Sequence, residues 1–287
     1  MATEIAQLIA EGVARIQRVA DDPRHEAEIL LGAALGRPRS YLIANPEQRI
    51  LDCEATDRYE AHLTRRAQGE PIAYILGEKE FWSLPLTVDP AVLIPRPETE
   101  LVVERALVHL PEHGGGRVLD LAAGSGAIAL AIASERRQAC VIGTDVSPAA
   151  VDLARVNAAR LGIGNADFRA GSWFEPVRGQ VFDLIASNPP YIAEDDPRVE
   201  RAVRRFEPHD ALFSGPTGLE ALRAIVADAP RHLLPGGWLV LEHGDGQAGS
   251  VRSLLAAAGF ESIGTHLDLA GRERCTEGRR PGSASAR

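Results

Sequence analysis

Four short apolar runs constrain the fold of this chain more than any other feature. They lie at residues 117–121, 141–144, 181–186 and 238–241, and helical stretches separate them at 127–135, 148–161 and 217–233. Apolar runs of this length, without polar alternation, are typical of parallel strands that are buried on both faces. The alternation of such strands with helices predicts a doubly wound α/β domain over residues 93–277.

The rest of the chain falls into three segments. Residues 1–76 carry apolar side chains at three- and four-residue spacing, which predicts a small helical bundle. Because this segment holds no cluster of chemically active side chains, we expect it to pack on or recognise a substrate. Residues 77–92 place aromatic and apolar residues between prolines, which is typical of a hairpin linker. The polar residues 278–287 predict a flexible tail.

The charge balance limits the classes of partner. The 287 residues include 31 Lys and Arg against 40 Asp and Glu, a formal net charge of −9. Direct nucleic-acid binding is therefore not expected, since general binding to phosphate requires basic surfaces. The three cysteines lie far apart and the histidines form no ligand motif, so no disulfide framework and no metal site are predicted. No run approaches the ~20 apolar residues of a membrane helix, and we expect a cytoplasmic protein.

A turn of small residues follows the first predicted strand, and it consists of Ala122, Ala123, Gly124, Ser125 and Gly126. Small residues allow a ligand to approach the main chain, and the free N–H groups of the following helix can bind it. Asp145 ends the next strand, where a carboxylate can accept hydrogen bonds from ribose hydroxyls. The pattern fits a nucleotide cofactor, and a tight turn without a ligand is the alternative.

Asp120 lies just before this turn and helps to distinguish two cofactors. The turn satisfies the dinucleotide pattern of NAD-binding proteins. A carboxylate at this place would repel a pyrophosphate, but it would suit the ammonium group of a methionyl moiety. The residue therefore favours S-adenosyl-L-methionine over NAD.

The run at 181–186 leads through Ser187 into Asn188, Pro189, Pro190 and Tyr191. Ligands of open α/β sheets bind beyond the carboxyl ends of the strands. A planar NH₂ group is a poor nucleophile, and two acceptors on its two N–H bonds can orient it. The Asn188 side chain and the Pro189 carbonyl can provide these acceptors, since prolines stiffen the turn. Tyr191 can stack on the flat acceptor group. A simple Asn-Pro turn is the alternative.

The Asn-Pro-Pro-Tyr motif after the run at 181–186 is similar to that of the amino-methyltransferases that use S-adenosyl-L-methionine. The whole chain resembles one branch of them, the release-factor glutamine methyltransferases of the HemK/PrmC type. Further matching stretches occur across residues 70–275, at 74–77, 81–82, 93–100, 187–192, 207–212, 235–238 and 268–272. The Pro-Arg-Pro-Glu-Thr-Glu segment at 95–100 and the residues that lead into Asn188 are the most specific of them.

The resemblance implies a Rossmann-like, seven-stranded class I methyltransferase sheet preceded by a small helical domain. It implies S-adenosyl-L-methionine as donor, S-adenosyl-L-homocysteine as product, and the glutamine of the Gly-Gly-Gln motif of peptide chain release factors as acceptor. The implied cofactor contacts are the turn at 122–126, Asp145, Trp173 and Asn188, and the implied acceptor contacts are Asn188 to Tyr191. One departure stands out, because the family's turn usually opens with Gly, whereas Ala122 and Ala123 occupy the first two positions here.

Several alternatives stay open at this point. A sister activity would methylate a glutamine of a ribosomal protein, and the same four residues also serve adenine N6 methylation of nucleic acid. An NAD-dependent oxidoreductase or a cofactor-binding regulator would leave the Asn188 motif without a role. Residues 96–100 either line the acceptor pocket or simply begin a helix. His243 is expected to be structural, and the long connection at 193–216 is expected to act as a lid.

Overall fold

The computed structural model describes residues 3–282, and the chain divides into two compact units. The first unit contains the residues up to Glu78 together with the short segment Arg201–Phe206. The second contains Lys79–Glu200 and the residues from Glu207 onward. A segment from the second half of the sequence thus belongs to the N-terminal unit, which the sequence did not indicate.

The first unit is helical. Its helices are α1 (Ile5–Ile16), α2 (Pro23–Leu35), α3 (Arg39–Ala44), α4 (Cys53–Ala67), α5 (Ile72–Leu76) and α9 (Arg201–Phe206), and its two short strands, β1 (Thr3–Glu4) and β2 (Arg49–Ile50), pair antiparallel. The apolar residues of α1 and α2 pack with Tyr59 and Leu63 of α4 in one core. The Arg205 guanidinium donates to the Gln68 carbonyl at 3.4 Å, which links α9 to the end of α4.

The second unit is built on a seven-stranded sheet with the order β10-β11-β9-β8-β5-β6-β7. Its strands are β5 (Arg117–Leu121), β6 (Cys140–Asp145), β7 (Ala166–Ala170), β8 (Phe182–Ser187), β9 (Leu233–Glu242), β10 (Glu261–Leu267) and β11 (Glu273–Arg279). Neighbouring strands from β7 to β9 pair parallel, and β11 pairs antiparallel with both β9 and β10. The four predicted strands are confirmed, and the α/β fold class is confirmed with them.

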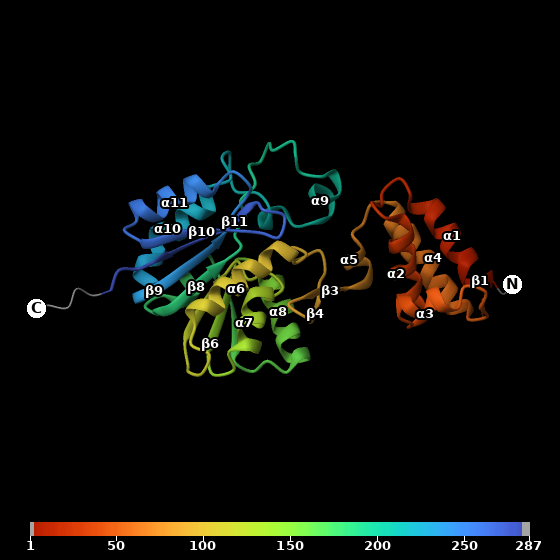
Figure 1. The fold of residues 1–287 in the computed structure, drawn as a ribbon, viewed down its shortest axis with the longest axis horizontal. Helices are drawn as coiled ribbons and strands as arrows, with labels where there is room; N and C mark the ends of the chain where they lie inside the picture. The colour runs from red at the N-terminus through yellow and green to blue at the C-terminus, as the bar shows by residue number, and fades with distance from the viewer. Residues whose placement is uncertain (1–2, 283–287) are drawn as a thin grey trace, which may run out of the picture. The chain divides into compact units, whose positions relative to one another are not determined.

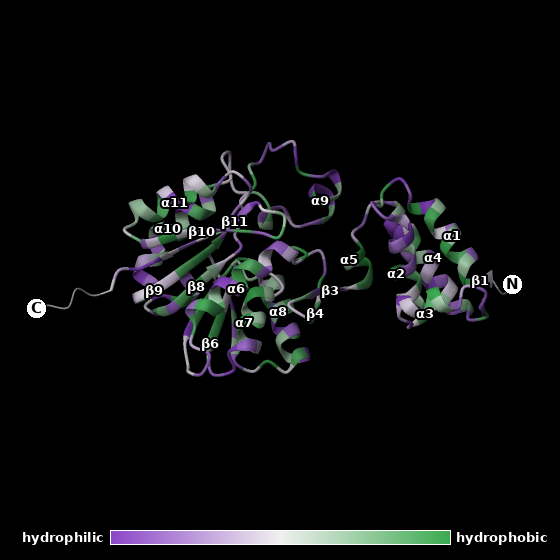
Figure 2. Ribbon diagram, viewed as in Figure 1, coloured by the Kyte–Doolittle hydropathy of each residue, from purple (hydrophilic) through white to green (hydrophobic). Residues whose placement is uncertain are grey.

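Helices cover both faces of this sheet (Figure 1). Buried side chains of α6 (Glu100–His109), α7 (Ala127–Glu135) and α8 (Pro148–Leu161) form one core, and those of α10 (Glu220–His232) and α11 (Ala248–Ala257) form the other. Helix α7 is hydrophobic along most of its length (Figure 2), as expected of a helix buried on several sides. The sheet is therefore sandwiched between two helical layers.

Helix α8 begins and ends where the sequence predicts. The Ser147 hydroxyl accepts a hydrogen bond from the Ala150 N–H at 3.2 Å, Pro148 occupies the first turn, and Gly162 adopts the left-handed conformation that ends the helix. The helix starts directly after Asp145, the last residue of β6. Its N-terminus consequently lies at the carboxyl edge of the sheet.

Strands β3 (Glu78–Phe81) and β4 (Leu84–Thr87) form the predicted hairpin, which is bound closely to α8. The Asn157 side chain is fully buried and makes three hydrogen bonds, two with the main chain of Thr87 and one with the Ser125 carbonyl. Arg160 donates to the Pro85 carbonyl at 2.8 Å. The hairpin from Lys79 onward is therefore part of the second unit rather than a free linker.

The predicted start of the flexible tail is wrong. Strand β11 continues to Arg279, and the Arg280 N–H donates to the Gly237 carbonyl at 2.7 Å. A polar sequence forms a strand here because β11 lies between two other strands, which hold its main chain from both sides. Residues 283–287 of the predicted tail lie outside the described residues. Within residues 3–282, none of the helices has the length and apolar character needed to cross a membrane.

Candidate active site

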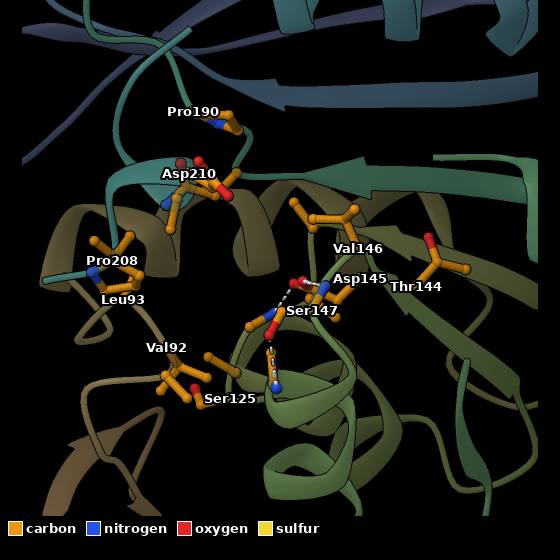
Figure 3. A pocket seen from close by; sticks show the side chains of 18 of the residues that line it. Val92, Leu93, Ser125, Thr144, Asp145, Val146, Ser147, Pro190, Pro208 and Asp210 are labelled. Atoms are coloured by element: carbon orange, nitrogen blue, oxygen red, sulfur yellow. Dashed lines mark hydrogen bonds between the residues drawn. The ribbon is translucent and has the colours of Figure 1, made fainter. Parts of the chain in front are cut away.

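A pocket of about 580 Å³ opens at the carboxyl edge of the sheet in the second unit. Its size falls in the range of small-molecule sites, and its walls are mostly apolar with a few polar groups. Figure 3 shows Asp145 and Ser147 together on one side, Leu93 and Pro208 on the opposite side, and Pro190 near the end of β8. The sequence predicts several of its lining residues, namely Ala122, Ala123, Gly124, Ser125, Asp145, Trp173, Asn188 and Pro190.

The turn between β5 and α7 forms one wall of the pocket. Ala122, Gly124 and Gly126 all have positive φ, at 59°, 53° and 83°. A Cβ atom at Gly124 would meet no atom within 4 Å, whereas one at Gly126 would lie 2.9 Å from the Phe168 ring. Gly124 therefore leaves the pocket open, and Gly126, which does not line it, lets the turn pack against the sheet. Ala122 carries a side chain in a conformation that favours glycine.

Asp145 holds this turn and the start of α8 together. Its carboxylate accepts hydrogen bonds from the Gly124 N–H and the Ser147 N–H, each at 2.9 Å. Burial raises the pKa of Asp145, although the two N–H groups favour its ionised form. Because each carboxylate oxygen accepts more than one hydrogen bond, the group can still bind hydroxyls of a ligand in the pocket.

Asp120 lies behind the turn, and its expected role toward an ammonium group stays a prediction. Its side chain is fully buried and does not line the pocket, and its carboxyl accepts from the Ala129 N–H at 3.0 Å. Burial raises its pKa to about 8 despite that hydrogen bond, and the nearby Asp145 adds to the rise. Asp120 thus anchors the start of α7 through one oxygen, while its other oxygen, Oδ1, has no hydrogen-bond partner within the described residues. Its position inside a strand, with its neighbours buried, accounts for its burial.

Trp173 lies on the loop between β7 and β8 and lines the pocket. Its φ of 44° is unusual for a bulky residue, and its carbonyl accepts a hydrogen bond from the Thr144 hydroxyl at 2.9 Å. This bond ties the loop to the end of β6, next to Asp145. The indole therefore sits beside the residues expected to bind a nucleoside.

Asn188 extends from the end of β8 into the pocket. Its side-chain NH₂ donates to the Thr99 hydroxyl at 3.0 Å, while no group within residues 3–282 donates to its Oδ1 atom. The Pro189 carbonyl likewise accepts no hydrogen bond from the described part of the chain, although Pro189 itself is buried and does not line the pocket. The two acceptors that the sequence predicts for an NH₂ group are thus both available.

Tyr191 does not line the pocket. Its hydroxyl donates to Glu242 Oε1 at 3.0 Å, and its ring packs against the core on the α10 and α11 face. Burial and the neighbouring Glu242 raise the pKa of Tyr191, which keeps the phenol neutral. The predicted stacking of this ring on an acceptor group stays a prediction.

Two segments far apart in the sequence form a wall that the sequence only partly indicates. The pocket is lined by Ala91, Val92, Leu93 and Pro95 from one segment and by Pro208, His209, Asp210 and Ala211 from the other. Glu207 connects the two segments, because its buried carboxylate accepts hydrogen bonds from the Ile94 N–H at 3.2 Å and from the Arg96 guanidinium at 2.6 Å. Thr99 and Pro95 also line the pocket, so the segment at 95–100 contributes to the site as well as preceding α6.

Models of two protein families match the chain. The PrmC N-terminal domain matches residues 7–77, and the methyltransferase small domain matches residues 100–208. Three relatives named release factor glutamine methyltransferase match almost throughout. The relative from Xylella fastidiosa is 49% identical over 96% of this chain and 98% of its own length. The relatives from Yersinia pestis and Escherichia coli are 51% and 44% identical, over 90% and 96% of this chain and 92% and 99% of their own.

Solved structures share the fold at low sequence identity. A methyltransferase from Pyrococcus furiosus superimposes with a TM-score of 0.53 and 19% identity, over 77% of this chain and 98% of that one. A 16S rRNA N2 G1207 methyltransferase from Thermus thermophilus, solved with AdoMet and guanosine, has a TM-score of 0.52 and 22% identity over 71% of this chain and 49% of that one.

The strand order and the antiparallel β11 are those of the class I methyltransferase fold, and the match to the methyltransferase small domain places the chain among the methyltransferases. Matches to both family models and identities of 44–51% over nearly the full length narrow the assignment. The chain belongs to the release factor glutamine methyltransferase family.

Proposed function

We propose that the protein transfers a methyl group from S-adenosyl-L-methionine to the side-chain amide nitrogen of the glutamine in the Gly-Gly-Gln motif of peptide chain release factors. The names of the relatives support this acceptor. The observation that carries the proposal is the placement of Asn188 beside a pocket of cofactor size, where no group of the described residues donates to its Oδ1 atom. Translation factors as substrates imply a cytoplasmic enzyme.

The residues of the pocket fit the proposed cofactor. The turn at 122–126 offers main-chain groups and open space at Gly124 for the methionyl part. Asp145 retains acceptor capacity for ribose hydroxyls, and Trp173 provides a flat apolar surface for a purine. When bound, S-adenosyl-L-methionine supplies a methyl group on a sulfonium, a leaving group that requires no further activation.

The remaining task of the protein is to align the acceptor amide. Asn188 Oδ1 and the Pro189 carbonyl can each accept a hydrogen bond from one N–H of the glutamine NH₂ group, and these two bonds fix the plane of the amide. Alignment of two reactants in a site can supply roughly 7–11 kcal/mol of the barrier. The amide nitrogen releases one proton as it gains the methyl group, and water can accept this proton without a general base.

We further propose that the helical first unit recognises the body of the acceptor protein. A glutamine side chain is too small to specify one target, so specificity requires contacts distant from the reacting nitrogen. Among the exposed large apolar side chains of the first unit, Ile43 and Leu51 are the most accessible, at 58% and 81%. A double substitution of both by Ser is expected to slow methylation of intact release factor and to leave that of a short Gly-Gly-Gln peptide unchanged.

The proposed activity is tested by incubation of the protein with methyl-labelled S-adenosyl-L-methionine and purified release factor. Label is expected on the Gly-Gly-Gln glutamine, and a release factor with Gly-Gly-Glu in its place is the matched control. Labelling of a ribosomal protein glutamine instead would assign the sister activity. Labelling of nucleic acid but of neither protein would overturn the assignment.

A further inference from the structure

The side chain of Gln247 binds the main chain at the end of the turn formed by residues 188–191. Gln247 directly precedes α11 and does not line the pocket. Its Nε2 atom donates a hydrogen bond to the Tyr191 carbonyl at 2.9 Å, and its Oε1 atom accepts one from the Gly244 N–H at 2.8 Å. An amide donates only through its nitrogen and accepts only through its oxygen. The two bonds together therefore fix the orientation of the Gln247 amide.

The main chain is closely packed around this amide. Gly218 has a positive φ of 70°, and its carbonyl accepts a second, longer hydrogen bond from Gln247 Nε2 at 3.4 Å. A Cβ atom at Gly218 would lie 2.5 Å from the Tyr191 carbonyl oxygen, and one at Gly244 would lie 3.0 Å from Gln247 Oε1. Such short distances leave no room for a side chain at either position. Two glycines thus allow one side chain to reach the carbonyl of Tyr191.

Other residues hold the beginning of the same turn. Ser187 ends β8, and the Asn188 NH₂ group donates to the Thr99 hydroxyl at 3.0 Å. The two prolines that follow have fixed φ angles, because their rings include the main-chain nitrogen. When both ends of such a turn are held, little freedom remains for the direction of the Pro189 carbonyl. This carbonyl belongs to the main chain, so no substitution can remove it, and the residues that hold the turn control it instead.

We propose that Gln247 is a positioning residue that, through the Tyr191 carbonyl, holds the turn with Asn188 Oδ1 and the Pro189 carbonyl directed at the acceptor NH₂ group. This inference deepens the proposed function and rests on it. Without the Gln247 amide, the Tyr191 peptide can rotate, and the two acceptors no longer match the two N–H bonds of one planar group. The loss affects alignment of the acceptor, whereas Asp145 and the turn at 122–126 stay in place for the cofactor.

The substitution Gln247→Glu tests the proposal on the full-length protein. It keeps the shape and the acceptor for the Gly244 N–H, but it places an oxygen instead of the NH₂ group against the Tyr191 carbonyl. We expect kcat to fall by about 10–100-fold and the Kd for S-adenosyl-L-methionine to stay within about twofold, since a misplacement of ~1 Å can cost about 10²-fold in rate. Gln180→Glu is the matched control, because the Gln180 side chain contacts Arg117 before the start of β8.

Gly218→Ala reaches the same carbonyl by a different route. The added Cβ atom displaces the Tyr191 carbonyl, and kcat is expected to fall as in Gln247→Glu. Gly179→Ala is its control, since Gly179 has a similar φ of 74° but a Cβ atom there would meet nothing within 4 Å. In a double variant with Asn188→Ala, the loss from Gln247→Glu is expected to be smaller than in the single variant, because residues that act as one unit are not additive.

Hydrogen exchange provides a measurement without the acceptor. The Ile192 N–H directly follows Tyr191 and donates to the Leu212 carbonyl at 3.0 Å. In Gln247→Glu and Gly218→Ala, this N–H is expected to exchange about 2–10-fold faster, the factor that corresponds to one net hydrogen bond. Unchanged exchange in both variants would overturn the proposal, and so would unchanged kcat in both.

Two further outcomes separate the positioning role from its alternatives. Losses that multiply fully with Asn188→Ala, or a parallel loss of Tm and cofactor binding, would overturn the proposal, since Gln247 would then be merely structural. If wild-type protein leaves release factor unmethylated while the exchange of the Ile192 N–H still responds to Gln247→Glu, Gln247 does hold the turn and the proposed function fails.

Discussion

Glu207 and Ile94 are 113 positions apart in the sequence, and the Glu207 carboxylate accepts a hydrogen bond from the Ile94 main chain at 3.2 Å. The same carboxylate pairs with Arg96 at 2.6 Å, and its side chain is almost fully buried. These contacts join the segment after β4 to the segment after α9 and so build one wall of the pocket. The wall depends on one charged side chain that itself does not line the pocket.

Glu207→Gln is expected to destabilise the protein by about 1–3 kcal/mol and to weaken cofactor binding. The amide places a donor against the Ile94 N–H or against Arg96, which leaves a buried donor unsatisfied. Urea unfolding and calorimetry with S-adenosyl-L-methionine measure the two effects. Asp196→Asn is the control, because it removes an ion pair with the exposed Arg198 that contributes about 0–1 kcal/mol. Equal effects of both substitutions would contradict the role given to Glu207.

Asn188→Ala is expected to lower kcat by about 10²–10³, the loss typical of one preorganised hydrogen-bond partner at a reacting group. The Kd for S-adenosyl-L-methionine is expected to change far less, since Oδ1 acts on the acceptor amide as positive charge develops. Single-turnover methylation of release factor and equilibrium binding of the cofactor separate the two quantities. Near-normal turnover in this variant would remove Asn188 from the proposed mechanism.

Asp145→Ala is expected to weaken cofactor binding by about 2–4 kcal/mol. The carboxylate orders the turn through the Gly124 N–H and the start of α8 through the Ser147 N–H, besides any bonds to ribose. Each lost net hydrogen bond costs about 0.5–1.5 kcal/mol, and the losses add here because one group makes them all. Calorimetry gives the affinity. A loss below about 1 kcal/mol, the net contribution of one hydrogen bond, would mean that Asp145 orders the turn without touching the ligand.

Ala122→Gly is expected to raise the free energy of unfolding by up to about 1 kcal/mol. A left-handed conformation costs an L-residue roughly 1–2 kcal/mol, and glycine removes this cost. The greater freedom of glycine in the unfolded chain opposes the gain and lowers it by about 0.4–1 kcal/mol. Ala131→Gly inside α7 is the matched control and is expected to destabilise by about 1 kcal/mol or more. Equal destabilisation by the two substitutions would contradict the strain at Ala122.

Glu277 is expected to contribute about 2–4 kcal/mol of stability that acid removes. Burial raises its pKa, but hydrogen bonds and charges from His109 and Arg105 outweigh burial and lower the pKa to about 2. Because the folded-state pKa lies below the unfolded value of about 4.3, this stability is present above that value and is lost as the pH falls toward 2. Unfolding of wild type and Glu277→Gln between pH 7 and pH 2.5 measures it, and the difference should shrink on acidification. A constant difference would show that packing, not charge, explains the effect.

The sequence predicts those parts of the site that depend on local pattern. Ser147, Pro148 and Gly162 bound α8 because capping acts within a few residues, and the small residues at 122–126 mark the turn for the same reason. Asn188 could be placed at the sheet edge because an apolar run precedes it. Their roles could be predicted because each depends only on the residue type and its position next to a predicted strand or helix.

Other parts depend on contacts between distant segments. The pairing of Glu207 with Ile94 has no local signal, and Asp120 faces inward because its strand is covered on both faces. His243 is buried and hydrogen-bonds to the Thr276 hydroxyl, as expected of a structural histidine. For its neighbour Glu242, the available signal in the sequence was a carboxyl group at the end of a buried strand. Such a residue becomes informative only when its partner Tyr191 is known.

Strand β11 also determines how the sheet is protected from other chains. Within the described residues it is the only strand that pairs with β10, and it covers the open edge of β9. Loss of its pairing would detach β10 and expose the main chain of β9 beside Leu239 and Leu241. An uncovered apolar edge of this kind is a template for intermolecular strand pairing. Substitutions that weaken β11 should consequently appear first as aggregation, before any defect in methyl transfer becomes measurable.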